Sequence, residues 1–252
     1  MRAAMAGDAN AVRSAPMART ETEPLPTGDD KVVAVRSMFD AIAPRYDLVN
    51  RVMTFRMDVG WRKRTIAQLA LPQAATVLDL ACGTGDLCKG LADAGLRPIG
   101  MDLSFGMLAA ARTPVPLAQA DALRLPVPDA SVDGVTCGFA LRNFVELAPF
   151  FAELARVVRP GGRIALLDVG VPHNPVIRWG NNIYFGKIVP KIGALLSDGA
   201  AYRYLPKSVA YLPDRAELVR LLRAAGFADA EHRQHTRVQC VDLGLQPCAA
   251  FN

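Results

Sequence analysis

Hydrophobic positions along the chain follow two alternating spacings, and together they predict an α/β fold. Short apolar runs bounded by turn residues are typical of buried strands, and apolar residues three or four positions apart are typical of the helices that cover them. Strands are expected at 75–80, 98–103, 117–120, 134–139 and 163–170. Helices are expected at 87–94, 104–112, 150–157 and 214–225. This alternation predicts a parallel sheet with helices on both faces.

The two ends of the chain depart from this alternation. Residues 1–30 are rich in Ala, Pro and Thr without an apolar period, and they predict a disordered tail. The remainder, 31–252, fits a single domain. Within it, 31–70 is expected to form a helical cap, 172–210 interrupts the rhythm as an insertion, and the last 25 residues leave room for two closing strands.

Composition and charge narrow the class of protein. The chain has 252 residues, and its net charge of +5 is concentrated in two blocks, 31–66 and 178–223, each with 8 basic and 3 acidic residues. Such blocks are compatible with binding to nucleic acid, with contact to an anionic membrane, or with an ordinary solvated surface. No apolar run reaches the roughly 18 residues of a membrane span. The five cysteines include no Cys-x-x-Cys pair, so neither a disulfide framework nor a metal site is expected, and a cytoplasmic location fits best.

A glycine-rich turn follows the first expected strand. The run Val77-Leu78-Asp79-Leu80-Ala81-Cys82-Gly83-Thr84-Gly85-Asp86 leads from a buried strand into a helix. Glycines let the backbone turn tightly and let a ligand approach, and the helix N-terminus attracts a carboxylate or phosphate. A dinucleotide fingerprint would have a third Gly at position 88, which is Cys88. The turn therefore favours a ligand other than a dinucleotide.

Two further acids stand at the ends of later strands. Asp102 lies 17 residues beyond Gly85, where a carboxylate can accept hydrogen bonds from ribose hydroxyls. Asp121 ends the third strand, where it can accept one from an adenine amine. Because open α/β sheets bind ligands at the carboxyl ends of their strands, the acids and the glycine turn together predict a nucleoside site.

This combination resembles class I S-adenosylmethionine-dependent methyltransferases. The resemblance implies a Rossmann-like, mostly parallel, seven-stranded sheet, with S-adenosyl-L-methionine as the methyl donor. Carried over position by position, it assigns cofactor binding to Asp79, Gly83, Thr84, Gly85, Asp102, Leu103, Asp121, Ala122 and Gly138.

Motifs outside the loop resemble the ubiquinone/menaquinone biosynthesis C-methyltransferase family, which includes the demethylmenaquinone methyltransferases. Residues 46–50 and 156–163 are similar to its two signatures, and 138–143 and 201–205 match its Arg-Asn and Tyr-Arg-Tyr-Leu segments. The resemblance covers about residues 31–230. The chain departs from the family where Asp58, Gly138, Asp168 and Gly170 replace the usual His, Ser, Glu and Ser.

The resemblance implies C-methylation of demethylmenaquinol to menaquinol, the last step of menaquinone biosynthesis. The acceptor must be the reduced ring, since an oxidised quinone is not a carbon nucleophile. Arg142 is expected to stabilise the developing phenolate, Asn143 to orient it or the hydroxyl, and Tyr46 to close over the methionine end. A purely structural ion pair of Arg142 with a neighbouring acid remains open.

The family resemblance also implies which molecules the protein binds. We expect a polyprenyl quinol as substrate, no nucleic acid, and a peripheral contact of the basic blocks with the anionic inner face of the cell membrane. It leaves a homodimer open, and it places 172–210 on the substrate side. The alternatives are a C-methyltransferase of a ubiquinone precursor or of another lipid or secondary metabolite and, in a different class, a nucleotide-dependent oxidoreductase.

Overall fold

The architecture is taken from a computed structural model of the chain. It describes residues 27–170, 179–180, 183–184, 204, 208, 211–231, 233–234 and 239–245. Nearly all of the expected tail and most of the expected insertion at 172–210 lie outside these ranges.

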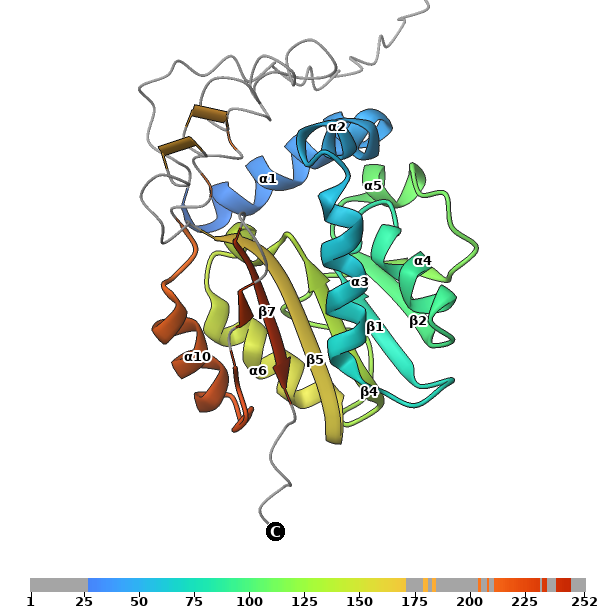
Figure 1. Ribbon diagram of the computed structural model, residues 1–252, viewed down its shortest axis with the longest axis vertical. Helices are drawn as coiled ribbons and strands as arrows, with labels where there is room; N and C mark the ends of the chain where they lie inside the picture. Colours follow the sequence, from blue (N-terminus) through green and yellow to red (C-terminus); the bar gives the residue numbers. More distant parts are fainter. Residues whose placement is uncertain are drawn as a thin grey trace, which may run out of the picture.

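The described elements alternate as the hydrophobic pattern predicts (Figure 1). The helices are α1 (Gly28–Ile42), α2 (Tyr46–Met53), α3 (Met57–Leu69), α4 (Asp86–Asp93), α5 (Phe105–Ala109), α6 (Leu147–Val157) and α10 (Arg215–Ala224), with short turns η1 (Ala43–Arg45) and η2 (Leu141–Asn143). The strands are β1 (Thr76–Leu80), β2 (Arg97–Asp102), β3 (Leu117–Gln119), β4 (Val132–Gly138), β5 (Val158–Gly170), β6 (Arg233–Gln234) and β7 (Gln239–Leu245).

The sheet has the strand order β3-β2-β1-β4-β5-β7-β6. The first five strands are parallel, and β7 runs antiparallel to both β5 and β6. The chain moves outward from β1 to β3 and then returns to place β4 on the other side of β1. In an open α/β sheet this switch point opens a crevice at the carboxyl ends of the strands, so the expected fold class is confirmed.

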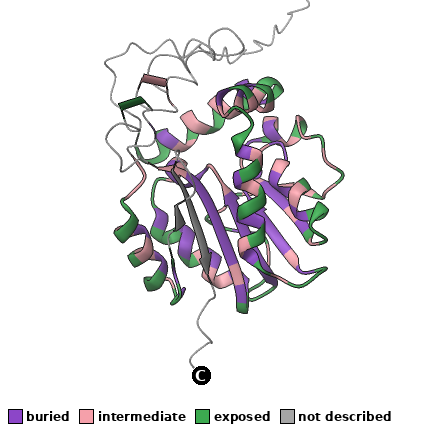
Figure 2. Ribbon diagram, viewed as in Figure 1, coloured by how far each residue is buried: buried purple, intermediate pink, exposed green. Residues whose placement is uncertain are grey.

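Helices cover both faces of the sheet. On one face, α3 and α4 pack Ile66, Leu69, Leu87 and Leu91 against the strands. On the other face, α6 and α10 contribute the large core cluster that includes Phe150, Phe151, Leu154, Leu218 and Leu222. The last four residues of β1 are buried in succession, as expected for a parallel strand covered on both sides. The central strands are accordingly buried, and exposed surface falls mainly on the helices (Figure 2).

The N-terminal helices form a cap over the carboxyl end of the sheet. Helices α1 and α2 lie across this end, and α3 runs from the cap down one face of the sheet (Figure 1). Ile42, Ala43, Val49 and Met53 of the cap form a separate small core with Met107 of α5. The cap is therefore packed against the loop that follows β2.

Several expected boundaries were wrong; β4 begins at Val132 instead of 134, and α6 at Leu147 instead of 150. Helix α1 begins at Gly28 instead of 31, since Asp29 and Asp30 in its first turn interact favourably with the helix dipole. Helix α5 ends at Ala109 instead of Arg112, because Thr113 precedes a proline and is biased away from helix. Strand β5 begins at Val158, before the Pro160-Gly161-Gly162 turn, and its pairing with β4 shifts register there. In the described part of the chain, no helix is long and apolar enough to cross a membrane.

Candidate active site

The glycine turn forms the floor of the candidate site. Gly83 and Gly85 adopt left-handed conformations with φ of 57° and 85°, which non-glycine residues rarely adopt. A Cβ on Gly83 would point toward the ring of Tyr46, 4.0 Å from its Cε1. The absent side chain therefore leaves a gap between the loop and the cap, which suits the methionine end of S-adenosylmethionine.

Asp79 lies beneath this turn rather than in the pocket. Its carboxylate is fully enclosed and accepts hydrogen bonds from Thr136 Oγ1 at 2.8 Å and Cys88 Sγ at 3.2 Å. Burial raises the pKa of Asp79 from 3.8 to about 6, although both hydrogen bonds oppose the shift. Asp79 therefore supports the loop from below and contributes a negative charge under it above that pH.

Asp102 stands at the centre of the candidate site. Its two carboxylate oxygens accept hydrogen bonds from the backbone N–H groups of Gly83 and Ser104, both at 2.8 Å. These bonds orient the carboxylate at the end of β2, where it lines the pocket. Burial raises the pKa of Asp102. Each oxygen retains a lone pair for a hydroxyl group, as a ribose contact requires.

Residues that follow β2 and β3 line another part of the pocket. They are Leu103 after β2, and Asp121, Ala122 and Leu123 after β3. Asp121 is held in a turn by the backbone N–H of Leu123, which donates to its Oδ1 at 2.9 Å. Apolar side chains beside a carboxylate are the environment expected for an adenine ring.

Gly138 at the end of β4 also lines the pocket. A Cβ there would lie 3.7 Å from Leu87 Cδ2, an ordinary contact distance. Packing therefore does not require glycine, and the serine usual in the resembled family would fit at this position.

The cap forms the opposite wall of the pocket. Val32, Val35, Arg36 and Phe39 of α1 line it together with Tyr46. The Tyr46 ring packs edge-on against Phe39, with centroids 5.9 Å apart, and burial raises the pKa of its hydroxyl. Tyr46 therefore lies over the glycine turn, where the sequence places it.

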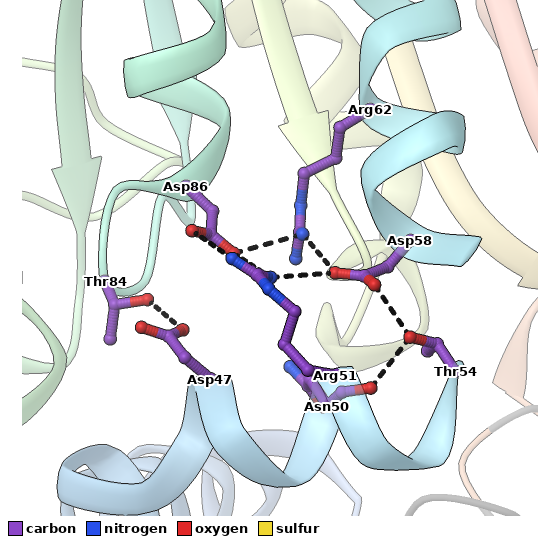
Figure 3. A network of polar contacts seen from close by, with 8 residues as sticks. All are labelled: Asp47, Asn50, Arg51, Thr54, Asp58, Arg62, Thr84 and Asp86. Carbon is purple, nitrogen blue, oxygen red and sulfur yellow. Dashed lines mark hydrogen bonds and ion pairs between the residues drawn. The ribbon is translucent and has the colours of Figure 1, made fainter. Parts of the chain in front are cut away.

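A network of ion pairs joins the cap to the glycine turn (Figure 3). Thr84 donates its hydroxyl hydrogen to Asp47 at 2.6 Å. Arg51 makes a bidentate contact with Asp86, the first residue of α4, at 2.9 and 3.0 Å. Thr84 is thus bonded to the cap and does not line the pocket. Gly85 does not line the pocket either; its left-handed backbone forms part of the turn.

Asp58 is the buried centre of this network. It is 1% exposed and accepts hydrogen bonds from Thr54 Oγ1 at 2.7 Å and from Arg51 and Arg62. Although burial opposes the shift, the Thr54 hydrogen bond and the charges of Arg62 and Arg51 lower the pKa of Asp58. A histidine could not accept from both arginines, so the departure at position 58 fits the cap's ion pairing. The roles of Arg51 and Arg62 in this network were not predicted from the sequence. The signal that could have indicated them is the excess of basic residues in 31–66.

The other side of the pocket is built around the turn η2. Asn143 lines the pocket, as expected, but Arg142 does not. The Arg142 guanidinium is buried, forms an ion pair with Asp168, and donates from Nε to Ser208 Oγ at 3.1 Å. The backbone N–H of Arg142 also donates to Asp168 Oδ2, at 3.2 Å. The structural pairing left open for Arg142 is therefore present.

Tyr204 is a site residue to which the sequence assigned no role. Its hydroxyl donates to Asn143 Oδ1 at 3.4 Å, and burial raises its pKa to about 12. The charge of Arg142 acts on both Tyr204 and Tyr46, where it opposes part of that shift. Arg142 is thus near enough to act on both tyrosines, and Tyr204 bonds to Asn143; of these four residues, Tyr46 and Asn143 line the pocket.

Fold and site together define a class I S-adenosylmethionine-dependent methyltransferase: the sheet order, the glycine turn, the Asp102 carboxylate at the end of β2 and the gap over Gly83 all fit this methyl donor. The sequence model of the ubiE/COQ5 methyltransferase family matches residues 27–245, and the chain belongs to this family. Among the described residues, no group of three or more His, Cys, Asp or Glu side chains is arranged to hold a metal ion.

Curated relatives agree with this family. The chain is 41% identical over 232 residues to a demethylmenaquinone methyltransferase of Deinococcus radiodurans, covering 87% of this chain and 93% of that protein. It is 40% identical to a ubiquinone/menaquinone biosynthesis C-methyltransferase of Syntrophotalea carbinolica, over 80% of this chain and 89% of that one. A putative methyltransferase of Haloferax volcanii, solved with the Trm112 activator, shares the fold at 21% identity and a TM-score of 0.58, over 83% of this chain and 97% of that one.

Proposed function

We propose that this protein methylates a ring carbon of demethylmenaquinol with S-adenosyl-L-methionine and forms menaquinol. The observation that carries the proposal is the pairing, within one pocket, of a ribose-accepting carboxylate with a polar cluster suited to a phenolic oxygen. The relatives at about 40% identity that are named for this reaction support the same substrate class.

The reaction requires an electron-rich acceptor ring. The methyl donor supplies an electrophilic methyl group on a sulfonium sulfur. When the methyl transfers, the carbon–sulfur bond breaks, a carbon–carbon bond forms, and the ring carbon then loses its hydrogen as a proton. Loss of the neighbouring phenolic proton makes that carbon more nucleophilic, so the protein needs to hold the ring in line and stabilise the phenolate oxygen.

Asn143 is suited to stabilise this oxygen. Because Tyr204 donates to its Oδ1, the amide is oriented with its Nδ2 hydrogens available to an acceptor. Asn143 lines the pocket, so we assign the Nδ2 group as the donor to the phenolate. Tyr204 is a positioning residue that sets the orientation of the amide.

Arg142 is suited to stabilise the negative charge of the phenolate through the Asn143 amide. Arg142 is the chain neighbour of Asn143, and its ion pair with Asp168 and its hydrogen bond to Ser208 fix the guanidinium in place. A fixed positive charge in a buried site stabilises an anion without reorganising. Arg142 stays protonated, so it acts through its charge and not as a free base.

The partners and location follow from the substrate. A polyprenyl quinol resides in a membrane, so we propose a cytoplasmic protein that meets the inner face of the cell membrane through its basic cap. The segment 172–210, assigned to the substrate side, is described here only at 179–180, 183–184, 204 and 208.

The test is an anaerobic incubation with methyl-labelled S-adenosylmethionine and short-chain acceptors. A demethylnaphthoquinol and a demethylbenzoquinol with the same side chain are compared, and the product is located by mass spectrometry and NMR. We expect the label on the ring carbon of the naphthoquinol. Label only on the benzoquinol would move the function to ubiquinone biosynthesis, and label on neither would reject quinol methylation.

A further inference from the structure

Helix α2 presents apolar side chains to solvent as well as to the core. Val49 and Met53 are buried on its inner side. Leu48 and Val52, four residues apart and hence on one face, are 57% and 39% exposed, and Phe55 in the turn that follows is 70% exposed. We call Leu48, Val52 and Phe55 the α2 apolar stripe. Within the stripe, the ring of Phe55 packs at an angle against Tyr184, with centroids 5.7 Å apart, yet most of its surface stays exposed. The stripe lies on a helix whose first residue, Tyr46, lines the pocket.

The turn after α2 holds Phe55 in a left-handed backbone conformation, which a bulky residue rarely adopts. The N–H groups of Phe55 and Arg56 donate to the carbonyls of Val52 and Arg51, at 3.3 and 3.0 Å. This is a Schellman motif, whose left-handed position is usually glycine. Here Phe55 occupies it with φ of 50°, and Arg56 follows with φ of 61°. A bulky residue in this conformation is uncommon and is typical of functional sites.

Among the described residues of the cap, the charges that flank α2 are mainly basic. All three acids of 31–66 have polar partners within the protein, although Asp40 is itself exposed: Asp40 with Ser104 and Gly106, Asp47 with Thr84, and Asp58 with Arg51 and Arg62. Arg45 and Arg56, which bracket α2, are exposed. In the portion of the chain described here, Arg56 takes part in no ion pair. The outer side of α2 is therefore apolar with a basic flank.

We propose that the α2 apolar stripe, with Arg45 and Arg56, docks this protein on an anionic phospholipid surface. Apolar side chains beside cations are the composition of an interfacial helix, in which the side chains enter the acyl boundary and the cations meet acidic headgroups. A stable dimer buries at least roughly 1,200 Å², which three side chains do not provide. The proposal rests on the proposed function for its biological role, since it places the pocket beside the bilayer that carries the quinol.

Vesicle binding tests the docking directly. Wild-type protein is sedimented with vesicles of phosphatidylcholine alone or mixed with phosphatidylglycerol, at low and high salt. We expect binding to the anionic vesicles that weakens with salt. The triple variant Leu48→Ser/Val52→Ser/Phe55→Ser should bind about tenfold more weakly or worse, and Arg56→Glu about fivefold more weakly.

Two controls separate docking from general damage. Phe55→Leu keeps an apolar side chain and should bind like wild type. Arg97→Glu makes the same charge change as Arg56→Glu but lies at the start of β2, at the opposite end of the sheet, and should bind like wild type. Equal binding by the triple variant, equal loss with Arg97→Glu, or a dimer that the triple variant converts to monomer would overturn the proposal.

Activity distinguishes the docking from the proposed function. The triple variant should methylate a soluble short-chain demethylnaphthoquinol at the wild-type rate but lose about tenfold on a long-chain quinol in anionic vesicles. Equal loss on both acceptors would overturn the docking. If wild type methylates neither quinol yet binds vesicles through the stripe, the proposed function fails and the docking stands.

Discussion

The two ends of the pocket are built in different ways. The nucleoside end consists of side chains that directly follow strands, such as Asp102 after β2, and backbone bonds hold them in place. The acceptor end joins segments far apart in sequence: Arg142 lies 26 residues from Asp168 and 66 from Ser208. The proposed cofactor site therefore depends on residues that are local in sequence, whereas the proposed acceptor site depends on long-range packing.

The largest effect is expected from Arg142→Ala. Turnover should fall about 10²–10³-fold, because the fixed charge next to the Asn143 amide is lost, while S-adenosylmethionine affinity stays near wild type. Stability should fall by about 3–5 kcal/mol, since Asp168 is left buried and unpaired. Calorimetry, urea unfolding and steady-state kinetics measure the three quantities.

The double variant Arg142→Ala/Asp168→Asn separates the two roles of Arg142. Removing the orphaned charge should restore most of the stability but not the turnover. Recovery of both would make Arg142 purely structural and would end its assignment to the acceptor site.

Asp102→Ala tests the nucleoside end. Two hydrogen bonds from ribose to a carboxylate contribute roughly 1.5–3 kcal/mol each, so S-adenosylmethionine affinity should fall by about 10²-fold or more. The control is Asp129→Ala, which removes the same charge from an exposed side chain. Unchanged affinity in Asp102→Ala, with circular dichroism like wild type, would remove Asp102 from the site.

Asp79→Asn tests the charge beneath the glycine turn. The folded-state pKa, about 6, lies above the ordinary value of 3.8, so ionisation costs stability as pH rises from about 4 to 6, and the cost is complete above that range. The variant should therefore be more stable than wild type at pH 8, by at most about 2–3 kcal/mol, and the difference should vanish near pH 4. Urea unfolding at both pH values measures it; a difference that grows toward low pH would contradict the assignment.

Arg51→Gln tests the link between cap and nucleoside end. Loss of its contacts with Asp86 and Asp58 should loosen the cap and weaken S-adenosylmethionine binding about three- to tenfold, because partly exposed ion pairs contribute little. Arg56→Gln, five residues along, removes the same charge outside the network and should leave this affinity unchanged. If the two variants behaved alike, the network of Figure 3 would have no role in binding.

Gly138→Ser should give the smallest effect. A Cβ at this position meets only Leu87 at 3.7 Å, so the fold should accept it, and the added hydroxyl should tighten S-adenosylmethionine binding about threefold. Titration calorimetry and thermal unfolding check both statements. A lower Tm would show instead that glycine is required at the end of β4.

Sequence alone predicted what depends on local chemistry. The strand and helix alternation, the glycine turn and the acids after β2 and β3 were placed correctly, since each depends on a few neighbouring residues. The boundaries of α1, α5 and β5 were wrong where acids in the first turn, a proline or a register shift decided them.

The long-range pairs could not be predicted. Asp58 and Asp168 were visible as departures from the family, but their partners became apparent only when the cap and η2 were placed. Likewise, Tyr204 meets Asn143 across 61 residues, a distance over which no local pattern operates.

The acceptor end is the central claim, and its chemistry depends on the oxidation state of the ring. The most direct measurement is an anaerobic single-turnover experiment in which the enzyme and methyl-labelled S-adenosylmethionine meet the same short-chain acceptor, either as demethylmenaquinol or as its quinone. We expect labelled product from the quinol alone, with a rate that collapses in Asn143→Ala. Equal labelling of the quinone, or an undiminished rate in Asn143→Ala, would contradict this expectation.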